Sequence, residues 1–286
     1  MPPNLAQRLE GLNELPPLPN TLSKVIQQMD MVSTSAATLE EIIKEDLTLA
    51  TKILKIANSP YYGLVGQVNS ISHAIVILGF NEVRNLVLGL SLTEAFATEK
   101  QVGAVSIKDI WLHSMGVATA SSWLSKFMEG IDVSSDELFT MGLLHDIGRF
   151  ILCSHLADDF KKILEFQEKQ NTQLFVAEEK YGLSHVEIGA YLAIRWGLGK
   201  RVTSVIRYHH SPKSGGEDEI PCAVIYLADQ LCHKLNIGWR DNNCNQKGVK
   251  FPKVLPITKE QVQTVANELK KKKDSLEKSW LKAVGG

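Results

Sequence analysis

The sequence predicts an all-α protein, and two kinds of observation support that class. Apolar residues recur at intervals of three and four along most of the 286 residues, which is the period of an amphipathic helix. Capping residues and breakers separate these segments, such as Ser70 before one apolar run and Gly79 after it. Two apolar runs, Ala74–Leu78 and Ala223–Leu227, could be strands by composition, but each lies between helical flanks and is assigned to a helix.

The first hundred residues contain short helices with recognisable ends. Asn20 follows a proline-rich stretch and can cap the first of them. Thr38, with Glu41 three residues later, forms a predicted capping box for the second. Residues 46–57 carry one apolar face and end at an Asn-Ser-Pro sequence, and a further helix is expected at about 81–97.

Helices continue in the same way beyond residue 106. They are expected at 107–128, 135–154, 156–170, 172–180, 184–195, 199–209 and 219–235, with a loop at 236–257 and a last helix at 258–284. This pattern predicts an N-terminal helical lobe over residues 1–105, a second helical lobe with the candidate site over 106–235, and a loop with a C-terminal helix over 236–286.

The composition excludes several classes of function. The 31 basic and 32 acidic residues leave a net charge of −1, which argues against direct DNA binding and against a membrane-surface protein. The N-terminus has no apolar signal-peptide core, and no apolar run approaches the roughly 18 residues of a membrane span. Cys153, Cys222, Cys232 and Cys244 have no Cys-x-x-Cys spacing, so reduced thiols in a cytoplasmic protein are expected.

The histidines provide the strongest functional signal. Five of the eight fall into one order along the chain, which Asp229 completes: His113, His145-Asp146, His185 and His209-His210. Imidazole and carboxylate ligands together suit iron, manganese or zinc, and this set is large enough to hold two divalent ions. We therefore expect these side chains to converge from separate helices on one metal site.

Each of these residues also has a plainer explanation. His113 could be an ordinary buried histidine, and Asp109 one turn earlier could form a salt bridge with it or act as a second ligand from the same face. His185 lies in the first turn of a helix, where Ser184 and Glu187 form a predicted capping box. A single metal site would explain at once why all these histidines and aspartates lie on otherwise apolar helices.

Residues around the His-Asp pair support a site at the edge of the core. Gly142 and Gly148 are small enough to let neighbouring helices approach. Arg149 lies one turn after Asp146 and could bind a phosphate oxygen or pair with a carboxylate of the metal site. Asp146 can offer one oxygen to each of two metals. Asp146, as the bridging ligand, and Arg149, as the phosphate-binding residue, are therefore the catalytic candidates. His209 and His210 end a predicted helix, and an imidazolium at a helix C-terminus is favourable in itself because it interacts with the helix dipole.

The chain resembles the HDOD family, the HD-related output domains of bacterial signalling proteins within the superfamily of HD metal-dependent phosphohydrolases. The residues that carry the resemblance span about 10–235 and include ELPPLPNTLSKVIQQM, IIKEDLTLATKILKIANSPYYG, WLHSMGVA, GLLHDIGR, SHVEIGAYLAIRWGL and VIRYHHSP. Leu47 departs from the proline that usually follows the aspartate in that family. The resemblance implies an N-terminal helical lobe packed on an HD-type helical lobe, and many members are regarded as non-enzymatic regulators.

The ligand positions also resemble those of the HD-GYP branch, which cleaves cyclic di-GMP. The matching residues are His113, His145, Asp146, His185, His209, His210 and Asp229. Asp109 takes the place of a glutamate ligand of that branch and Arg149 that of a lysine. The GYP segment itself is absent, and the chain reads SPKSGGEDEIP after the double histidine.

Three functional hypotheses follow. The first is a cytoplasmic signalling protein with an intact metal site that binds a nucleotide, a cyclic dinucleotide or a signalling protein partner. The second is a working metal-dependent phosphohydrolase that acts on a nucleotide or cyclic dinucleotide. The third is a structural interaction module in which the histidines are relics, and the metal content of the protein distinguishes it from the other two.

Overall fold

A computed structural model describes residues 17–29, 35–64, 66–96, 101–239, 241 and 249–284, together with Leu5, Leu9 and Leu15. Nearly all regular structure in these residues is helical. Within the same residues the strands are β1 (Gln101–Val102) and β2 (Val105–Ser106), which form one short antiparallel pair. The predicted all-α class is therefore confirmed.

The chain forms two compact units. The larger unit consists of Met1–Leu15 and Thr98–Lys270, and the smaller unit consists of Pro16–Ala97 and Lys271–Gly286. The predicted segment 236–286 is shared between them, because helix α15 (Lys259–Val284) contributes residues to each unit.

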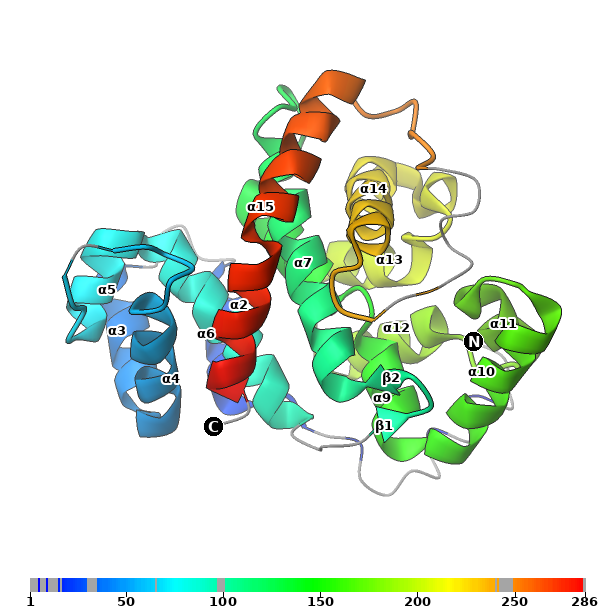
Figure 1. Ribbon diagram of the computed structural model, residues 1–286, viewed down its shortest axis with the longest axis horizontal. Coiled ribbons are helices and arrows are strands. Elements are labelled where there is room, and N and C mark those ends of the chain that lie inside the picture. Colours follow the sequence, from blue (N-terminus) through cyan, green and yellow to red (C-terminus); the bar gives the residue numbers. More distant parts are fainter. Residues whose placement is uncertain are drawn as a thin grey trace. The chain divides into compact units, whose positions relative to one another are not determined.

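Five helices of the smaller unit pack on one another (Figure 1). They are α2 (Asn20–Met29), α3 (Ala36–Lys44), α4 (Leu47–Ala57), α5 (Ile71–Leu78) and α6 (Phe80–Ala95). Ser70 caps α5 as expected, since its hydroxyl accepts from the His73 N–H. The predicted start of α3 is wrong. Ser35 and not Thr38 is its N-cap, because the Thr38 N–H donates to the Ser35 hydroxyl.

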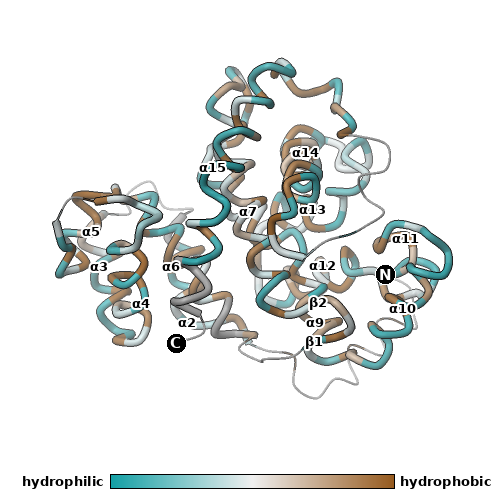
Figure 2. The backbone as a smooth tube through the Cα atoms, in the orientation of Figure 1, coloured by the Kyte–Doolittle hydropathy of each residue, from teal (hydrophilic) through white to brown (hydrophobic). Residues whose placement is uncertain are grey.

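The larger unit holds the remaining helices around its own core. They are α7 (Ile107–Ser125), α8 (Ser135–Leu144), α9 (Ile147–His155), α10 (Ala157–Gln170), α11 (Leu174–Lys180), α12 (His185–Arg195), α13 (Lys200–Tyr208), the 3-10 helix η1 (Pro212–Asp218) and α14 (Glu219–Leu235). Helix α7 packs against α8 and α14, and these three contribute most of a buried apolar cluster. The hydrophobic stretch of α14 appears as a brown segment in Figure 2.

The helix predicted over 135–154 is interrupted in its middle. His145 is the C-cap of α8 and Asp146 is the N-cap of α9. The backbone of Asp146 has φ −101° and ψ 18°, which is outside the α-helical region. This break lies in the buried part of the unit, so both side chains of the His-Asp pair are fully buried.

Two glycines bring helices to the site, as the sequence suggests. A Cβ on Gly142 would lie 2.8 Å from the Cα of Ala118, and a Cβ on Gly148 would lie 2.0 Å from the carbonyl oxygen of His185. Both distances are shorter than van der Waals contact. Helices α7 and α8, and likewise α9 and α12, therefore approach more closely than any larger residue would permit.

Two features suggested by composition can be compared with the structure. Cys153, Cys222 and Cys232 are buried and form no disulfide, while Cys244 lies outside the described residues. None of the described helices is by itself long and apolar enough to cross a membrane. Only the pair Ile71–Leu78 and Phe80–Leu92, bent by 120°, meets that test by length and composition.

Candidate metal centre

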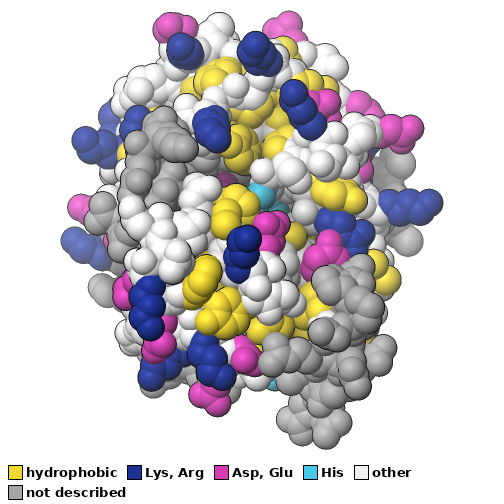
Figure 3. All heavy atoms as spheres, turned by 90° about the vertical axis from the view of Figure 1, so that its right-hand side faces the viewer, with side chains coloured by type: hydrophobic (Ala, Val, Ile, Leu, Met, Phe, Trp, Pro, Cys, Tyr) yellow, Lys and Arg dark blue, Asp and Glu magenta, His cyan; other side chains and the backbone are white. Residues whose placement is uncertain are grey.

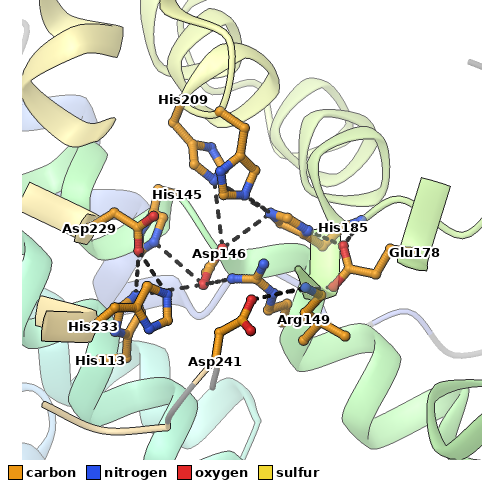
Figure 4. Close-up of polar contacts among 12 residues, drawn as sticks. His113, His145, Asp146, Arg149, Glu178, His185, His209, Asp229, His233 and Asp241 are labelled. Atoms are coloured by element: carbon orange, nitrogen blue, oxygen red, sulfur yellow. Dashed lines mark hydrogen bonds and ion pairs between the residues drawn. The ribbon is translucent and has the colours of Figure 1, made fainter. Parts of the chain in front are cut away.

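Seven of the eight predicted ligands come together inside the larger unit. His113 comes from α7, His145 and Asp146 from the α8–α9 junction, His185 from the start of α12, His209 and His210 from the end of α13, and Asp229 from α14 (Figure 4). All of them are buried except His210, which is half-buried. Four helices and the α8–α9 junction thus direct nitrogen and oxygen atoms into one interior space.

Asp146 lies between two groups of imidazoles. Its Oδ1 is 3.3 Å from Nε2 of His185 and 3.7 Å from Nε2 of His209. Its Oδ2 faces the other group, at 3.4 Å from Nε2 of His145 and 4.0 Å from Nε2 of His113. Each carboxylate oxygen therefore has its own set of nitrogen neighbours, which is the arrangement of a carboxylate that bridges two ions.

Backbone carbonyls fix the tautomers of two of these histidines. The Nδ1–H of His145 donates to the Gly142 carbonyl at 2.7 Å, and the Nδ1–H of His209 donates to the Ile206 carbonyl at 2.9 Å. In His113 the shorter contact is that of Nε2 with Oδ1 of Asp229, at 2.9 Å, while Nδ1 is 3.3 Å from the Ile237 carbonyl. A carbonyl oxygen can only accept, so in His145 and His209 the proton is on Nδ1 and the lone pair is on Nε2, facing the interior. Metal-ligating histidines are held in this way.

The histidines of α12 and α13 place like atoms close together. Nε2 of His185 lies 3.4 Å from Nε2 of His209 and 3.2 Å from Nε2 of His210. In a tetrahedral zinc site with bonds of about 2.0–2.1 Å, ligand nitrogens are about 3.3 Å apart. The three nitrogens are thus spaced as they would be around one ion.

Among the predicted ligands, two buried polar atoms lack a hydrogen-bond partner within the described residues, namely Nε2 of His145 and Oδ1 of Asp146. An unsatisfied buried polar atom costs about 1–3 kcal/mol. A cation in each of the two groups would satisfy one of these atoms, so the residues fit a metal. The same donor set suits zinc, iron or manganese.

The electrostatics of the centre favour the ligand forms of His209, Asp146 and Asp229. For His145, burial opposes protonation but the neighbouring Asp146 outweighs it and raises the pKa. Burial lowers the pKa of His209 to about 3, so that imidazole is neutral at physiological pH. Burial opposes the ionisation of Asp146, but Arg149 and His145 outweigh it and hold the carboxyl pKa well below its ordinary value. The pKa of Asp229 shifts in the same direction. Neutral imidazoles and ionised carboxylates are the states that bind metal.

Asp109 is the predicted ligand that the structure uses for another purpose. Its Oδ2 accepts from the Ser106 hydroxyl at 2.6 Å and from the Ser106 N–H at 3.3 Å, while the Ser106 hydroxyl accepts from the Asp109 N–H. This is a complete capping box at the start of α7. The carboxylate is one helical turn from His113 in sequence, but its hydrogen bonds to Ser106 cap the start of α7.

Arg149 pairs with carboxylates of the site. Its guanidinium forms an ion pair with Oδ2 of Asp146 and another, at 3.3 Å, with Oε1 of Glu178. It is 2% exposed and lies 4.6 Å from the ring centroid of Trp239. In this conformation Arg149 acts as the counter-charge of Asp146, which is the second of the two roles considered for it.

Glu178, on α11, orients His185 from behind. One of its carboxylate oxygens accepts from both the backbone N–H of His185, at 3.2 Å, and Nδ1 of the same residue. The predicted capping box at this position is wrong, because the Ser184 side chain makes no cap hydrogen bond. A buried carboxylate on an adjacent helix takes the place of the cap, and it turns Nε2 of His185 towards Asp146.

Three further residues line this site that are not among the residues predicted from the sequence. Glu178 shares a helical stripe with the buried Leu174 and Ala177, a signal that could have distinguished it from its exposed neighbour. His233 lies one turn after Asp229, so the same reasoning could have placed it beside that carboxylate. Trp239 lies in a segment without periodicity, and nothing local in the sequence indicates its position.

The centre lies below a hollow on one face of the molecule. A histidine side chain is visible at the bottom of that hollow (Figure 3). Among the site residues, His210 is the half-buried histidine, and its ring stacks on Phe175 with centroids 4.4 Å apart. The opposite end of the centre, around His113, is closed by Trp239, whose exposed fraction is 3%.

Comparison with known proteins gives a consistent result. A family model described as the HDOD domain matches residues 15–212. A protein of uncharacterised function from Treponema pallidum (strain Nichols) is 25% identical over 213 residues, which are 74% of this chain and 40% of that protein. The chain therefore spans less than half the length of this relative.

Several solved structures have the same fold. An HDOD domain protein of unknown function from Geobacter sulfurreducens matches with a TM-score of 0.81 at 20% identity, over 98% of this chain and 96% of that chain. A protein from Marinobacter aquaeolei VT8, provisionally assigned to signal transduction, matches with a TM-score of 0.79 at 25% identity, over 97% of this chain and 61% of that chain. A provisionally assigned phosphohydrolase from Shewanella amazonensis SB2B matches with a TM-score of 0.69 at 22% identity, over 95% and 97%.

Proposed function

This chain belongs to the HDOD domain family, and on that premise we propose that it is a regulatory signalling protein built around a two-metal centre. The observation that carries the proposal is the position of Asp146, whose two oxygens face separate groups of imidazole nitrogens. A histidine-rich core without a metal would leave Nε2 of His145 and Oδ1 of Asp146 without a hydrogen-bond partner.

The residues divide into two metal positions. One is formed by His113, His145 and Asp229 with Oδ2 of Asp146, and the other by His185, His209 and His210 with Oδ1 of Asp146. Bound divalent ions would supply Lewis acidity and lower the pKa of a coordinated water. The protein itself holds the imidazole tautomers, keeps the carboxylates ionised and excludes bulk water from most of the centre.

A regulatory role is favoured over turnover by the closure of the site. Arg149 is engaged by two carboxylates, and Trp239 covers the His113 side. Metal binding to such a centre stabilises the folded unit, because the ligands come from six helices, α8 and α9 at their junction, that the ions hold together. On this proposal the protein acts by binding a nucleotide or a signalling partner, and the metal-loaded state is the competent one.

A second candidate function is metal-dependent phosphoester hydrolysis. The observation in its favour is the half-buried His210, which stacks on Phe175 and leaves the second metal position the more accessible of the two. A phosphate oxygen that entered there would meet Arg149 if the guanidinium left one of its carboxylates. The two candidates share the metal centre and differ in whether the bound ligand is consumed.

The experiment begins with elemental analysis of purified protein reconstituted separately with Mn²⁺, Fe²⁺ and Zn²⁺. Two ions per chain are expected. The loaded protein is then incubated with a panel of nucleotides and cyclic dinucleotides, and binding and product formation are measured on the same samples. Binding without product supports the regulatory proposal, and product that disappears in Asp146→Ala supports hydrolysis. Protein that takes up none of the three metals refutes both functions.

A further inference from the structure

Helix α14 carries a pair of buried polar residues, Asp229 and His233, one turn apart on its inner face. Their side chains are 4% and 3% exposed, although the helix around them is largely apolar on that side. A pair at positions i and i+4 on one helix face can present two ligands to the same ion. His233 is not needed for either of the two positions assigned above.

Asp229 has two imidazole neighbours on the same oxygen. Its Oδ1 lies 2.9 Å from Nε2 of His113 and 3.2 Å from Nε2 of His233. The two imidazole rings are 4.4 Å apart with an interplanar angle of 30°. The three ligand atoms all lie within 4.8 Å of one another, and the two separations from Oδ1 are close to the roughly 3.3 Å between ligands around one zinc ion.

The hydrogen bonding around Asp229 makes its Oδ1 the common neighbour of both imidazoles. The Nε2–H of His113 donates to Oδ1 of Asp229 at 2.9 Å, and Nε2 of His233 lies 3.2 Å from the same oxygen. Nδ1 of His113 makes only a longer contact of 3.3 Å with the Ile237 carbonyl, and Nδ1 of His233 is buried with no hydrogen-bond partner within the described residues. A divalent ion that displaced the Nε2 protons could bind the carboxylate and both imidazoles.

The surroundings hold this arrangement in place. Trp239 makes a T-shaped contact with the His233 ring, with centroids 4.9 Å apart, and its backbone N–H donates to the Asp109 carbonyl. A Cβ on Gly238 would lie 2.3 Å from the backbone nitrogen of His113, so this segment packs directly on α7. The ligand atoms are thus positioned by backbone contacts and do not depend on a mobile side chain.

We propose that His113, Asp229 and His233 form a metal position that does not depend on Asp146 and that takes a divalent ion of the zinc, iron or manganese class. The proposal rests on the proposed function, since it assigns ligands within the same centre. Two imidazoles and one carboxylate are a recognised set for zinc and for non-haem iron, with positions left for water or a ligand. Nε2 of His113 can bind only one ion. That ion can therefore take either His233 or Asp146 as a further ligand.

The test compares Zn²⁺ content in wild type, His233→Gln, Asp146→Asn and the double variant. His73→Gln is the matched control, because it also removes one imidazole but from an exposed position on α5 of the smaller unit. We expect Asp146→Asn to keep the ion held by His113, Asp229 and His233, and the double variant to hold one ion fewer than Asp146→Asn. His233→Gln alone should weaken the affinity for one ion by at least about tenfold, measured by competition with a chromogenic chelator.

A second variant tests the proposal through a new absorption band, whereas the first test depends on a decrease in metal content or affinity. His233→Cys loaded with Co²⁺ should show a near-ultraviolet thiolate-to-cobalt absorption band that Co²⁺-loaded wild type lacks. If wild type binds metal while His233→Gln and His73→Gln have equal content and affinity, and His233→Cys shows no band, His233 only donates a hydrogen bond to Asp229 and the proposal fails. If wild type binds no metal at all, the proposed function fails before this inference is reached.

Discussion

Gly148 is the residue at which the packing of the fold and the geometry of the metal centre can be tested together. An alanine Cβ at this position would lie 2.0 Å from the carbonyl oxygen of His185, 2.8 Å from the carbonyl carbon and 2.9 Å from the backbone nitrogen of Gly189. All three atoms belong to the backbone of α12, so no side chain can rotate away. Gly148→Ala therefore requires α9 and α12 to separate by more than about 1 Å to restore contact distance.

The separation has two consequences that can be given magnitudes. Overpacking against a rigid backbone costs about 3 kcal/mol of the free energy of unfolding or somewhat more, which corresponds to a fall in Tm of roughly 6–12 °C for a unit of this size. Asp146 and His185 lie on the two helices that move apart, and their ligand atoms are 3.3 Å apart. Metal sites tolerate deviations of about 0.2 Å, so the affinity for the ion between them should fall by at least about tenfold.

The assay is thermal unfolding of chelator-treated protein by far-UV circular dichroism, followed by Zn²⁺ titration of the folded variant. Gly199→Ala is the matched control. Its Cβ would meet nothing within 4 Å, and its φ of −54° is accessible to alanine. If Gly148→Ala melts within about 2 °C of wild type and of Gly199→Ala and binds the same amount of Zn²⁺, the close approach of α9 and α12 is not what positions the two ligands.

Three further substitutions test separate parts of the centre. Glu178→Gln should lower the Zn²⁺ affinity by about 10–100-fold in competition titrations, since the carboxylate orients His185, and unchanged affinity would contradict that role. Asp109→Ala should lower the free energy of unfolding by about 1 kcal/mol in urea titrations through loss of the helix cap, with metal content unchanged; loss of one ion would make it a ligand. Arg149→Met should destabilise chelator-treated protein by about 3–5 kcal/mol, because Asp146 loses its buried counter-charge, and Zn²⁺ should restore much of this. Equal destabilisation with and without Zn²⁺ would argue against a metal beside Asp146.

Local chemistry in the sequence predicts most of the helices and the kinds of ligand. The period of the apolar residues and caps such as Ser70 act within a few residues, so they are visible without tertiary information. Gly142 and Gly148 could be recognised as packing positions for the same reason, because only glycine lacks a Cβ. The order of histidines and aspartates indicates a metal site, since a buried polar residue on an apolar helix requires a partner.

Tertiary contacts alone decide which polar atoms meet. Asp109 and Asp229 were both candidate ligands, yet Asp109 is engaged by a hydroxyl three residues away, while Asp229 meets an imidazole 116 residues away. The carboxylate that orients His185 comes from a separate helix, and the carbonyl that lies 3.3 Å from Nδ1 of His113 comes from the loop after α14. These pairings depend on the distances between packed helices, which close glycine contacts set to within fractions of an ångström. The period of apolar residues along the chain does not encode the distance between two helices.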